Sequence, residues 1–212
     1  MQIPLMAHTA ATYILDAANN HLPVYAGLTQ VAAELIIHFA SKDLLETFVP
    51  NMLSGKWGGT MCLTEPQAGS SLSDIVTKAK PTQNGYYNIS GQKIFISGGD
   101  NQFAENIVHL VLARVEGAAK GTKGISLFIV PKNRNNSNGS LESNDVTTVA
   151  DFQKMGQKGY CTTHLGFGDK DDCQGWLVGE ENQGLNYMFL MMNAARIAVG
   201  RASSAIASAA YY

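Results

Sequence analysis

Apolar residues recur at helical spacing through the first quarter of this 212-residue chain. From Leu5 to about Leu53 they return every three or four positions, a period that predicts two or three helices. Ser41 is expected to cap the last of these helices, over 42–53, and Ser54 to end it. The residues that set this period are Ile14, Leu15, Ala18, Leu28, Val31, Ala32, Leu35, Ile36, Phe39, Leu44, Leu45, Phe48 and Met52.

Beyond Gly59 the pattern changes to short runs rich in β-branched and aromatic residues, separated by Gly, Asn and Asp. These runs predict strands, and no helical period lies between them. Such a density of strands favours an antiparallel sandwich or barrel over alternating strands and helices. The polar stretch 132–144 is expected to be a surface loop. The predicted strands include 86–89, 93–96, 107–115, 125–130 and 162–167.

From Asn182 the period becomes helical again and continues to the last residue without a stop signal, so we expect the natural protein to extend further. The sequence therefore predicts an α+β fold. It has N-terminal helices over 1–57, a central β-barrel or sandwich over 58–180, and the start of a second helical domain over 181–212. The apolar face of the last helix is predicted to comprise Leu185, Met188, Phe189, Met192, Ala195, Val199, Ala202, Ile206 and Ala209.

Composition narrows the class of protein. A hydrophobic content of 45% is enough for a real core. The formal charge of −2 gives no electrostatic case for binding nucleic acid, which needs clustered Lys and Arg. Three widely spaced cysteines, with no metal-ligand spacing, favour a reduced cytoplasmic setting and no metal. No basic leader and no apolar run of about 20 residues is found, so neither a signal peptide nor a membrane span is expected.

Two stretches contain residues that could carry chemistry. In the first, 61–70, a strand runs into a proline, a glycine and hydroxyl groups, which is a suitable place to hold a polar ring edge or a phosphate. On pattern alone, a strand followed by an ordinary turn is the favoured interpretation. In the second, 91–99, Phe95 and Ser97 are two apart and share a strand face. Phe95 could lie against a planar cofactor whose edge Ser97 binds, but on pattern alone the preferred interpretation is that Phe95 is a core residue.

Beyond pattern, these stretches resemble two motifs of the FAD-dependent acyl-CoA dehydrogenases. MCLTEPQAGS is similar to the family's flavin-binding signature, and GQKIFISGG to its GxK(W/F)I(T/S)NG element. ENIVHLVLAR, GTKGISLFIVPK, KMGQKG, WLVGEENQGL and MMNAAR follow in the family's order. The resemblance covers nearly the whole chain and is strongest to the large 3-methylmercaptopropionyl-CoA dehydrogenase-like members.

The resemblance implies roles for individual residues. Thr64 would meet the flavin pyrimidine edge, and Ser70 would lie near the FAD pyrophosphate and the CoA chain. Phe95 would lie beside the isoalloxazine and Ser97 would bond to it, while Arg196 would line the acyl-CoA channel. The cofactor-binding set implied in this way is Met61, Cys62, Leu63, Thr64, Ser70, Phe95, Ile96 and Ser97, and the substrate-binding set is Ser70, Asn193 and Arg196.

Three positions depart from the family pattern. Ser71 stands where an aspartate usually follows AGS, and Phe95 replaces the commoner tryptophan. Ala195 lies where the isovaleryl and long-chain branches have their catalytic glutamate, and a methyl group cannot accept a proton. The resemblance therefore implies no catalytic base within these residues, and a base beyond residue 212. A fragment of this kind is expected to bind FAD weakly or not at all and to be inactive alone.

The activity that the resemblance implies is the α,β-dehydrogenation of acyl-CoA thioesters to 2-enoyl-CoA. A carboxylate removes the α-proton, the β-hydride passes to the flavin, and an electron-transfer flavoprotein takes the electrons. A homodimer or higher oligomer is implied for the full-length protein. Three alternatives stay open: an acyl-CoA oxidase, a nucleic-acid-associated AidB-like flavoprotein, and a non-enzymatic β-domain that binds a partner.

Several other polar residues have structural explanations. His109 lies between apolar neighbours on a predicted strand, and is expected to be a hydrogen-bonded structural histidine, as is His164. Glu65 precedes a proline and is interpreted as part of the turn architecture. The acidic run 169–172 is interrupted by a lysine and lacks the spacing of a calcium loop, so a solvated turn is expected. The methionines of 188–192 are expected to pack in the core.

Overall fold

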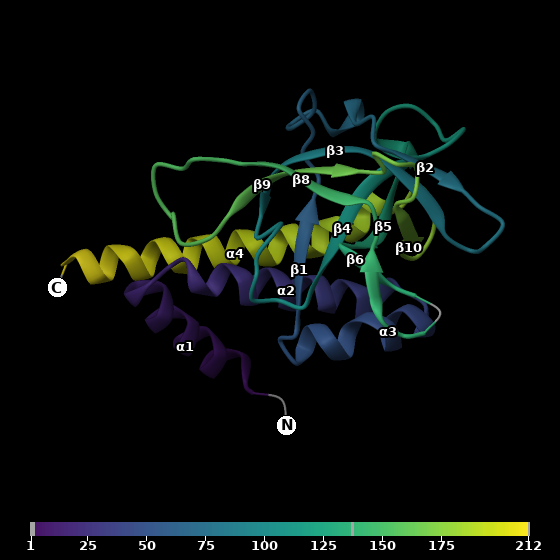
Figure 1. Cartoon of the computed structure of the whole chain (residues 1–212). Coiled ribbons are helices and arrows are strands. Elements are labelled where there is room, and N and C mark those ends of the chain that lie inside the picture. The colour runs from purple at the N-terminus through teal and green to yellow at the C-terminus, as the bar shows by residue number, and fades with distance from the viewer. Residues whose placement is uncertain (1–2, 137, 212) are drawn as a thin grey trace.

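The computed structural model describes residues 3–136 and 138–211, and in it the helices gather on one side of a strongly curved sheet (Figure 1). The expected α+β class is confirmed. The helices are α1 (Leu5–Ala18), α2 (Leu22–Phe39), α3 (Lys42–Leu53) and α4 (Gly184–Tyr211). The strands are β1 (Trp57–Cys62), β2 (Lys78–Pro81), β3 (Tyr87–Ser97), β4 (Asn106–Val115), β5 (Ile125–Pro131), β6 (Asn133–Asn135), β7 (Leu141–Ser143), β8 (Val146–Asp151), β9 (Thr162–Phe167) and β10 (Gln174–Leu177).

Three helices form in the N-terminal region, where two or three were expected, and the last has the predicted bounds. The hydroxyl of Ser41 accepts a hydrogen bond from the Leu44 N–H at 3.5 Å and caps α3. That helix ends at Leu53, as expected. Pro23 lies in the first turn of α2, where its missing N–H leaves no helical bond unmade.

Five strands close into a barrel. β4, β5, β10 and β3 are neighbours in that order, and β2 pairs with both β3 and β4, so the ring is complete. β9 and β8 extend the sheet beyond β3, and β1 extends it beyond β4. The pairs are antiparallel except β1 with β4 and β2 with β4. The predicted barrel is therefore confirmed, with two parallel pairs within it.

The stretch 132–144 is not simply a loop, because it contains the short hairpin of β6 and β7. Arg134 and Glu142 face each other in its register, and their side chains form an ion pair at 2.8 Å. The guanidinium of Arg134 also reaches Asp172 at 2.7 Å. These cross-strand contacts order a sequence whose composition alone indicates a turn.

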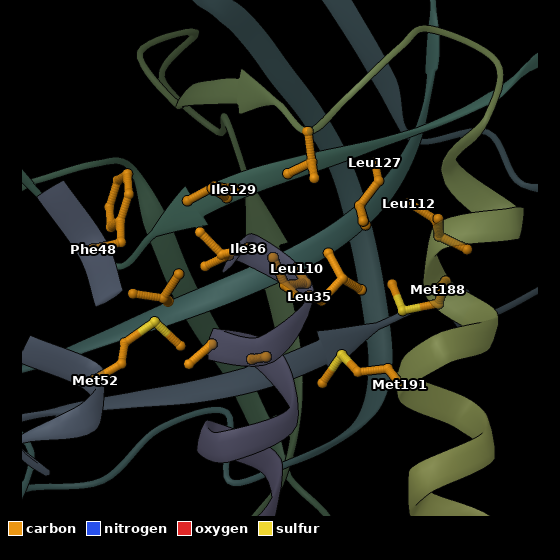
Figure 2. Close-up of a cluster of buried hydrophobic side chains, with 14 of the residues drawn as sticks. Leu35, Ile36, Phe48, Met52, Leu110, Leu112, Leu127, Ile129, Met188 and Met191 are labelled. Carbon is orange, nitrogen blue, oxygen red and sulfur yellow. The ribbon is translucent and has the colours of Figure 1, made fainter. Parts of the chain in front are cut away.

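One hydrophobic core joins the helices to the sheet (Figure 2). Side chains from α2, α3 and α4 meet those of β4 and β5, all with almost no solvent exposure. The buried residues labelled in the figure are Leu35, Ile36, Phe48, Met52, Leu110, Leu112, Leu127, Ile129, Met188 and Met191. The expectation that the α4 methionines pack in the core is confirmed. A second core fills the barrel and includes Cys62, Ile96, Val111 and Phe128.

The helix α2 packs closely on β1. A Cβ built on Gly59 would lie 2.9 Å from the Cβ of Ala32, and the Gly59 N–H donates to the Thr29 hydroxyl at 2.9 Å. By length and composition alone, α2 could also cross a membrane, although the sequence predicted no such segment. In the structure its inner face, which includes Leu35 and Ile36, is fully buried against the rest of the chain.

The face of α4 that packs inward differs in part from the predicted one. Met188 is buried as expected, but Val199 is 66% exposed and Ala205 is buried instead. The cause is the path of the helix, which starts at Gly184 against the β5 backbone and then runs along α2 and α1. The contact stripe therefore moves around the helix, and in its second half it includes Arg201, which pairs with Asp16 of α1 at 2.8 Å.

Candidate functional site

The two stretches singled out in the sequence lie side by side. Thr64 follows the end of β1, and its carbonyl accepts a hydrogen bond from the Ile94 N–H of β3 at 2.9 Å. This bond crosses between strands that are not neighbours in the sheet order. The fold thus places the Thr64 segment against the part of β3 that leads to Phe95 and Ser97.

A β-bulge turns Phe95 outward. The register of β3 with β9 shifts between Lys93 and Ile96, and Phe95 adopts a φ of 58°. Bulges re-aim side chains in this way, and a positive φ is unusual for an aromatic residue. The Phe95 ring is 57% exposed and lies 4.6 Å from that of Phe152, centroid to centroid. Phe95 is therefore a surface ring and not the core residue that the simpler interpretation suggested.

The two stretches carry three hydroxyl groups, those of Thr64, Ser70 and Ser97. Thr64 and Ser97 are partly buried and Ser70 is exposed. Within the described part of the chain, none of these three hydroxyls makes a hydrogen bond. Partly buried hydroxyls normally find a partner. Together with an exposed aromatic face, such hydroxyls suit a planar ligand with a polar edge, for which an isoalloxazine ring is the candidate.

Two residues of the predicted cofactor-binding set point away from this surface. Cys62 and Ile96 are buried inside the barrel, where burial raises the pKa of the Cys62 thiol to about 12. Met61 and Leu63 alternate with Cys62 and pack toward the helical core instead. Cys62 and Ile96 can therefore serve a ligand only through their backbone groups.

The turn after Ser70 is anchored by Asp74. The hydroxyls of Ser71 and Ser73 donate to the two Asp74 carboxylate oxygens at 2.6 and 3.0 Å. These bonds, that from Ser71 first, lower the pKa of Asp74. Ser71 thus takes part in the turn as a donor, at the position where the family pattern has an acidic acceptor.

The proposed substrate-binding pair lies on α4. Asn193 and Arg196 are both exposed, and the Arg196 guanidinium donates to the Asn193 amide oxygen at 2.8 Å. Ala195 is half-buried between them. Their predicted role in holding acyl-CoA stays a prediction.

His109 has the character of a structural residue. Its Nδ1 lies 2.7 Å from the Thr60 hydroxyl, and the ring is fully buried. Burial lowers its pKa to about 3, so the ring is neutral at ordinary pH. Its Nε2 has no partner among residues 3–136 and 138–211, so the expected hydrogen bonding is only half met. His164, by contrast, is partly exposed and lies 3.1 Å from the Gln92 side-chain oxygen.

The acidic run 169–172 forms a turn, as expected. The Asp171 N–H donates to the Gly168 carbonyl at 3.2 Å, and Asp171 has a φ of 58°. The Asp169 carboxylate accepts from Thr147 at 2.9 Å. These contacts give the run a structural role.

Two residues near the site were missed by sequence reasoning. Phe152 supports the Phe95 ring, but it lies in a stretch with no signal of its own. Lys93 is fully buried and pairs with Glu65 at 2.9 Å. The signal for Lys93 was a charged residue at the start of the predicted strand 93–96, and the pairing confirms that Glu65 belongs to the turn architecture.

The site thus combines an exposed aromatic ring with hydroxyls that have no hydrogen-bond partner among the described residues, on a β-barrel backed by helices. A sequence model described as the acyl-CoA dehydrogenase middle domain matches residues 60–170. The chain therefore belongs to the acyl-CoA dehydrogenase family, as the resemblance implied.

Individual relatives agree with this assignment. A butyryl-CoA dehydrogenase of Syntrophomonas wolfei is 46% identical over 100% of this chain and 36% of its own length. A 3-methylmercaptopropionyl-CoA dehydrogenase of Ruegeria pomeroyi is 42% identical, with the same two coverages. The structure of butyryl-CoA dehydrogenase from Megasphaera elsdenii matches with a TM-score of 0.77 and 25% identity, over 95% of this chain and 49% of that one. The chain thus spans about a third of the length of these curated relatives.

Proposed function

We propose that this chain supplies the flavin-facing part of an FAD-dependent acyl-CoA dehydrogenase. The observation that carries the proposal is the outward Phe95 ring on a segment that the Ile94 N–H bonds to the Thr64 carbonyl. Among the described residues, the hydroxyls of Thr64 and Ser97 in these segments have no hydrogen-bond partner. A planar ring system can stack on Phe95 while these hydroxyls bind its polar edge. Ser70, exposed on the following turn, is the candidate for the phosphate end of the cofactor.

The residues of this chain would act by binding and orienting. Hydrogen bonds from Thr64 and Ser97 to the ring edge would favour negative charge there, an effect that is strong where water is excluded. FAD, when bound, supplies the two-electron oxidation. The proton-accepting carboxylate is proposed to lie outside these residues, because Ala195 cannot serve.

The proposed substrates are acyl-CoA thioesters, and the proposed electron acceptor is an electron-transfer flavoprotein. The names of the relatives support the substrate class, because both curated ones are dehydrogenases of acyl-CoA compounds. Asn193 and Arg196 on α4 are proposed to contact the substrate. Activity, partners and a homodimer or higher oligomer are proposed for the whole protein, because this chain spans only about a third of the length of its curated relatives.

The proposal is tested by titrating the chain with FAD and following flavin fluorescence. We expect weak, saturable binding that each of the variants Thr64→Val and Ser97→Ala weakens by about fivefold, since a hydrogen bond contributes about 1 kcal/mol. Ser203→Ala, which removes a hydroxyl that bonds the Val199 carbonyl on α4, is the matched control and should bind as wild type. Equal binding by all four proteins would reject the proposed site.

A further inference from the structure

A buried ion pair joins the chain segment that follows Thr64 to the part of β3 that leads to Phe95. The Lys93 ammonium is 2.9 Å from a carboxylate oxygen of Glu65, and the two side chains are 0% and 1% exposed. Glu65 follows Thr64 in the chain, and Lys93 comes two residues before Phe95. Each member of the pair therefore adjoins one half of the proposed site.

The Glu65 carboxylate also binds residues outside its own turn. It accepts hydrogen bonds from the Val76 N–H at 2.7 Å, the Thr77 N–H at 3.0 Å and the Thr77 hydroxyl at 2.5 Å. The Gln67 side chain adds another at 2.7 Å. Since a buried charge without partners is very costly, these bonds leave the carboxylate a single favourable position.

The Lys93 ammonium bonds to the residues on either side of Thr64, Leu63 and Glu65. Besides Glu65, it donates to the Leu63 carbonyl at 3.0 Å. The next residue of β3, Ile94, donates its N–H to the Thr64 carbonyl at 2.9 Å. Hydrogen bonds and the ion pair thus connect residues 63–65, one after another, to residues 93 and 94, where the bulge of β3 begins.

Electrostatics agree with a charged pair. Burial raises the pKa of Glu65, but Lys93 and the hydrogen bonds from Thr77 and Val76 outweigh this effect, so that the pKa lies below its usual value. Burial lowers the pKa of Lys93, and Glu65 opposes that shift. Buried ion pairs commonly add little net stability compared with apolar replacements, but they can specify a unique geometry.

We propose that Lys93 and Glu65 are positioning residues that fix the Thr64 segment against the Phe95–Ser97 segment, so that both face one planar ligand. This inference rests on the proposed function for the identity of the ligand. The positive φ of Phe95 supports it, because a strained residue persists only where its surroundings determine it.

The test is amide hydrogen exchange of Ile94, whose N–H forms the bond between the segments, relative to Leu110 in the middle of β4. In Lys93→Met the ratio of the Ile94 rate to the Leu110 rate should rise at least tenfold. The matched control Arg201→Met breaks the buried pair with Asp16 between α1 and α4. It should leave this ratio within twofold of wild type, since that pair joins α1 to α4 and makes no bond to residues 63–65 or 93–94. An unchanged ratio in folded Lys93→Met would overturn the inference.

A milder variant covers the case in which Lys93→Met does not fold. Thr77→Val keeps the shape of the side chain but removes one hydrogen bond to Glu65, and we expect a roughly threefold rise in the same ratio. No rise would count against the inference. A parallel FAD titration separates the two proposals: a raised ratio together with no FAD binding by wild type would reject the flavin role but keep the coupling between the segments.

Discussion

At the scale of single residues, the chemistry of the site depends on one backbone conformation. Phe95 has a φ of 58°, which disfavours any side chain with a Cβ, and this conformation presents the ring to solvent. The spacing of Phe95 and Ser97 could be read from the sequence, and so could the hydroxyls. The bulge could not, because it arises from the pairing of β3 with β9, about 70 residues away along the chain.

The positive φ of Phe95 predicts an unusual order of stability for the glycine and alanine variants at this position. Phe95→Gly should be more stable than Phe95→Ala by about 1 kcal/mol, because glycine adopts a positive φ without the steric penalty. In an ordinary strand alanine would be the more stable of the two. Urea unfolding of both variants measures the difference, and a more stable alanine variant would show that Phe95 is not strained.

A second residue-scale prediction concerns His109. Its pKa is about 3 in the folded chain, against 6.5 for an ordinary histidine. Between these values the unfolded chain binds more protons, so stability is complete above pH 6.5 and falls as the pH drops toward 3. The slope due to this residue approaches about 1.4 kcal/mol per pH unit.

The variant His109→Asn keeps a polar atom that can bond to Thr60 but does not titrate. Its unfolding free energy should therefore fall less steeply with decreasing pH than that of wild type. Chemical denaturation at several pH values between 6.5 and 4 measures both slopes. Identical slopes would mean that His109 is protonated in the folded chain.

At the scale of elements, local patterns in the sequence predict where helices and strands form, but not how each of them packs. The periodicity predicted the helices and most strands because local spacing encodes which face is buried. It did not predict the β6–β7 hairpin, which depends on Arg134 contacting Glu142 and Asp172. Nor did it give the inward face of α4, because that face follows from the changing neighbours of the helix.

Gly58 and Gly59 of β1 provide a matched pair of variants at this scale. A Cβ on Gly59 would meet Ala32 at 2.9 Å, whereas one on Gly58 would meet Ile107 at 3.7 Å, an ordinary contact. Gly59→Ala should therefore destabilise the chain by about 1–3 kcal/mol, as overpacking does, and Gly58→Ala by less than about 0.5 kcal/mol. Thermal or urea unfolding compares them, and equal effects would contradict the close packing of α2 on β1.

At the scale of the whole molecule, an ion pair joins α1, near the start of the chain, to α4, near its end. The Arg201 guanidinium bonds to the buried Asp16 carboxylate at 2.8 Å. Arg201→Met should cost roughly 3 kcal/mol, because it leaves a buried carboxylate unpaired. The double variant with Asp16→Leu should recover most of that loss in urea unfolding. A double variant that is no more stable than Arg201→Met would show that the buried charge is not the cause.

The central claim is that Thr64, Phe95 and Ser97 form a flavin platform, and mapping the amide NMR shifts caused by FAD tests it most directly. FAD is added to the labelled chain up to millimolar concentration, so that weak binding is detected. We predict that the largest shifts occur at Thr64 and at Phe95 to Ser97, and that α3 is unaffected. Shifts confined to other parts of the chain, or no shift at these residues at the highest concentration, would contradict the account.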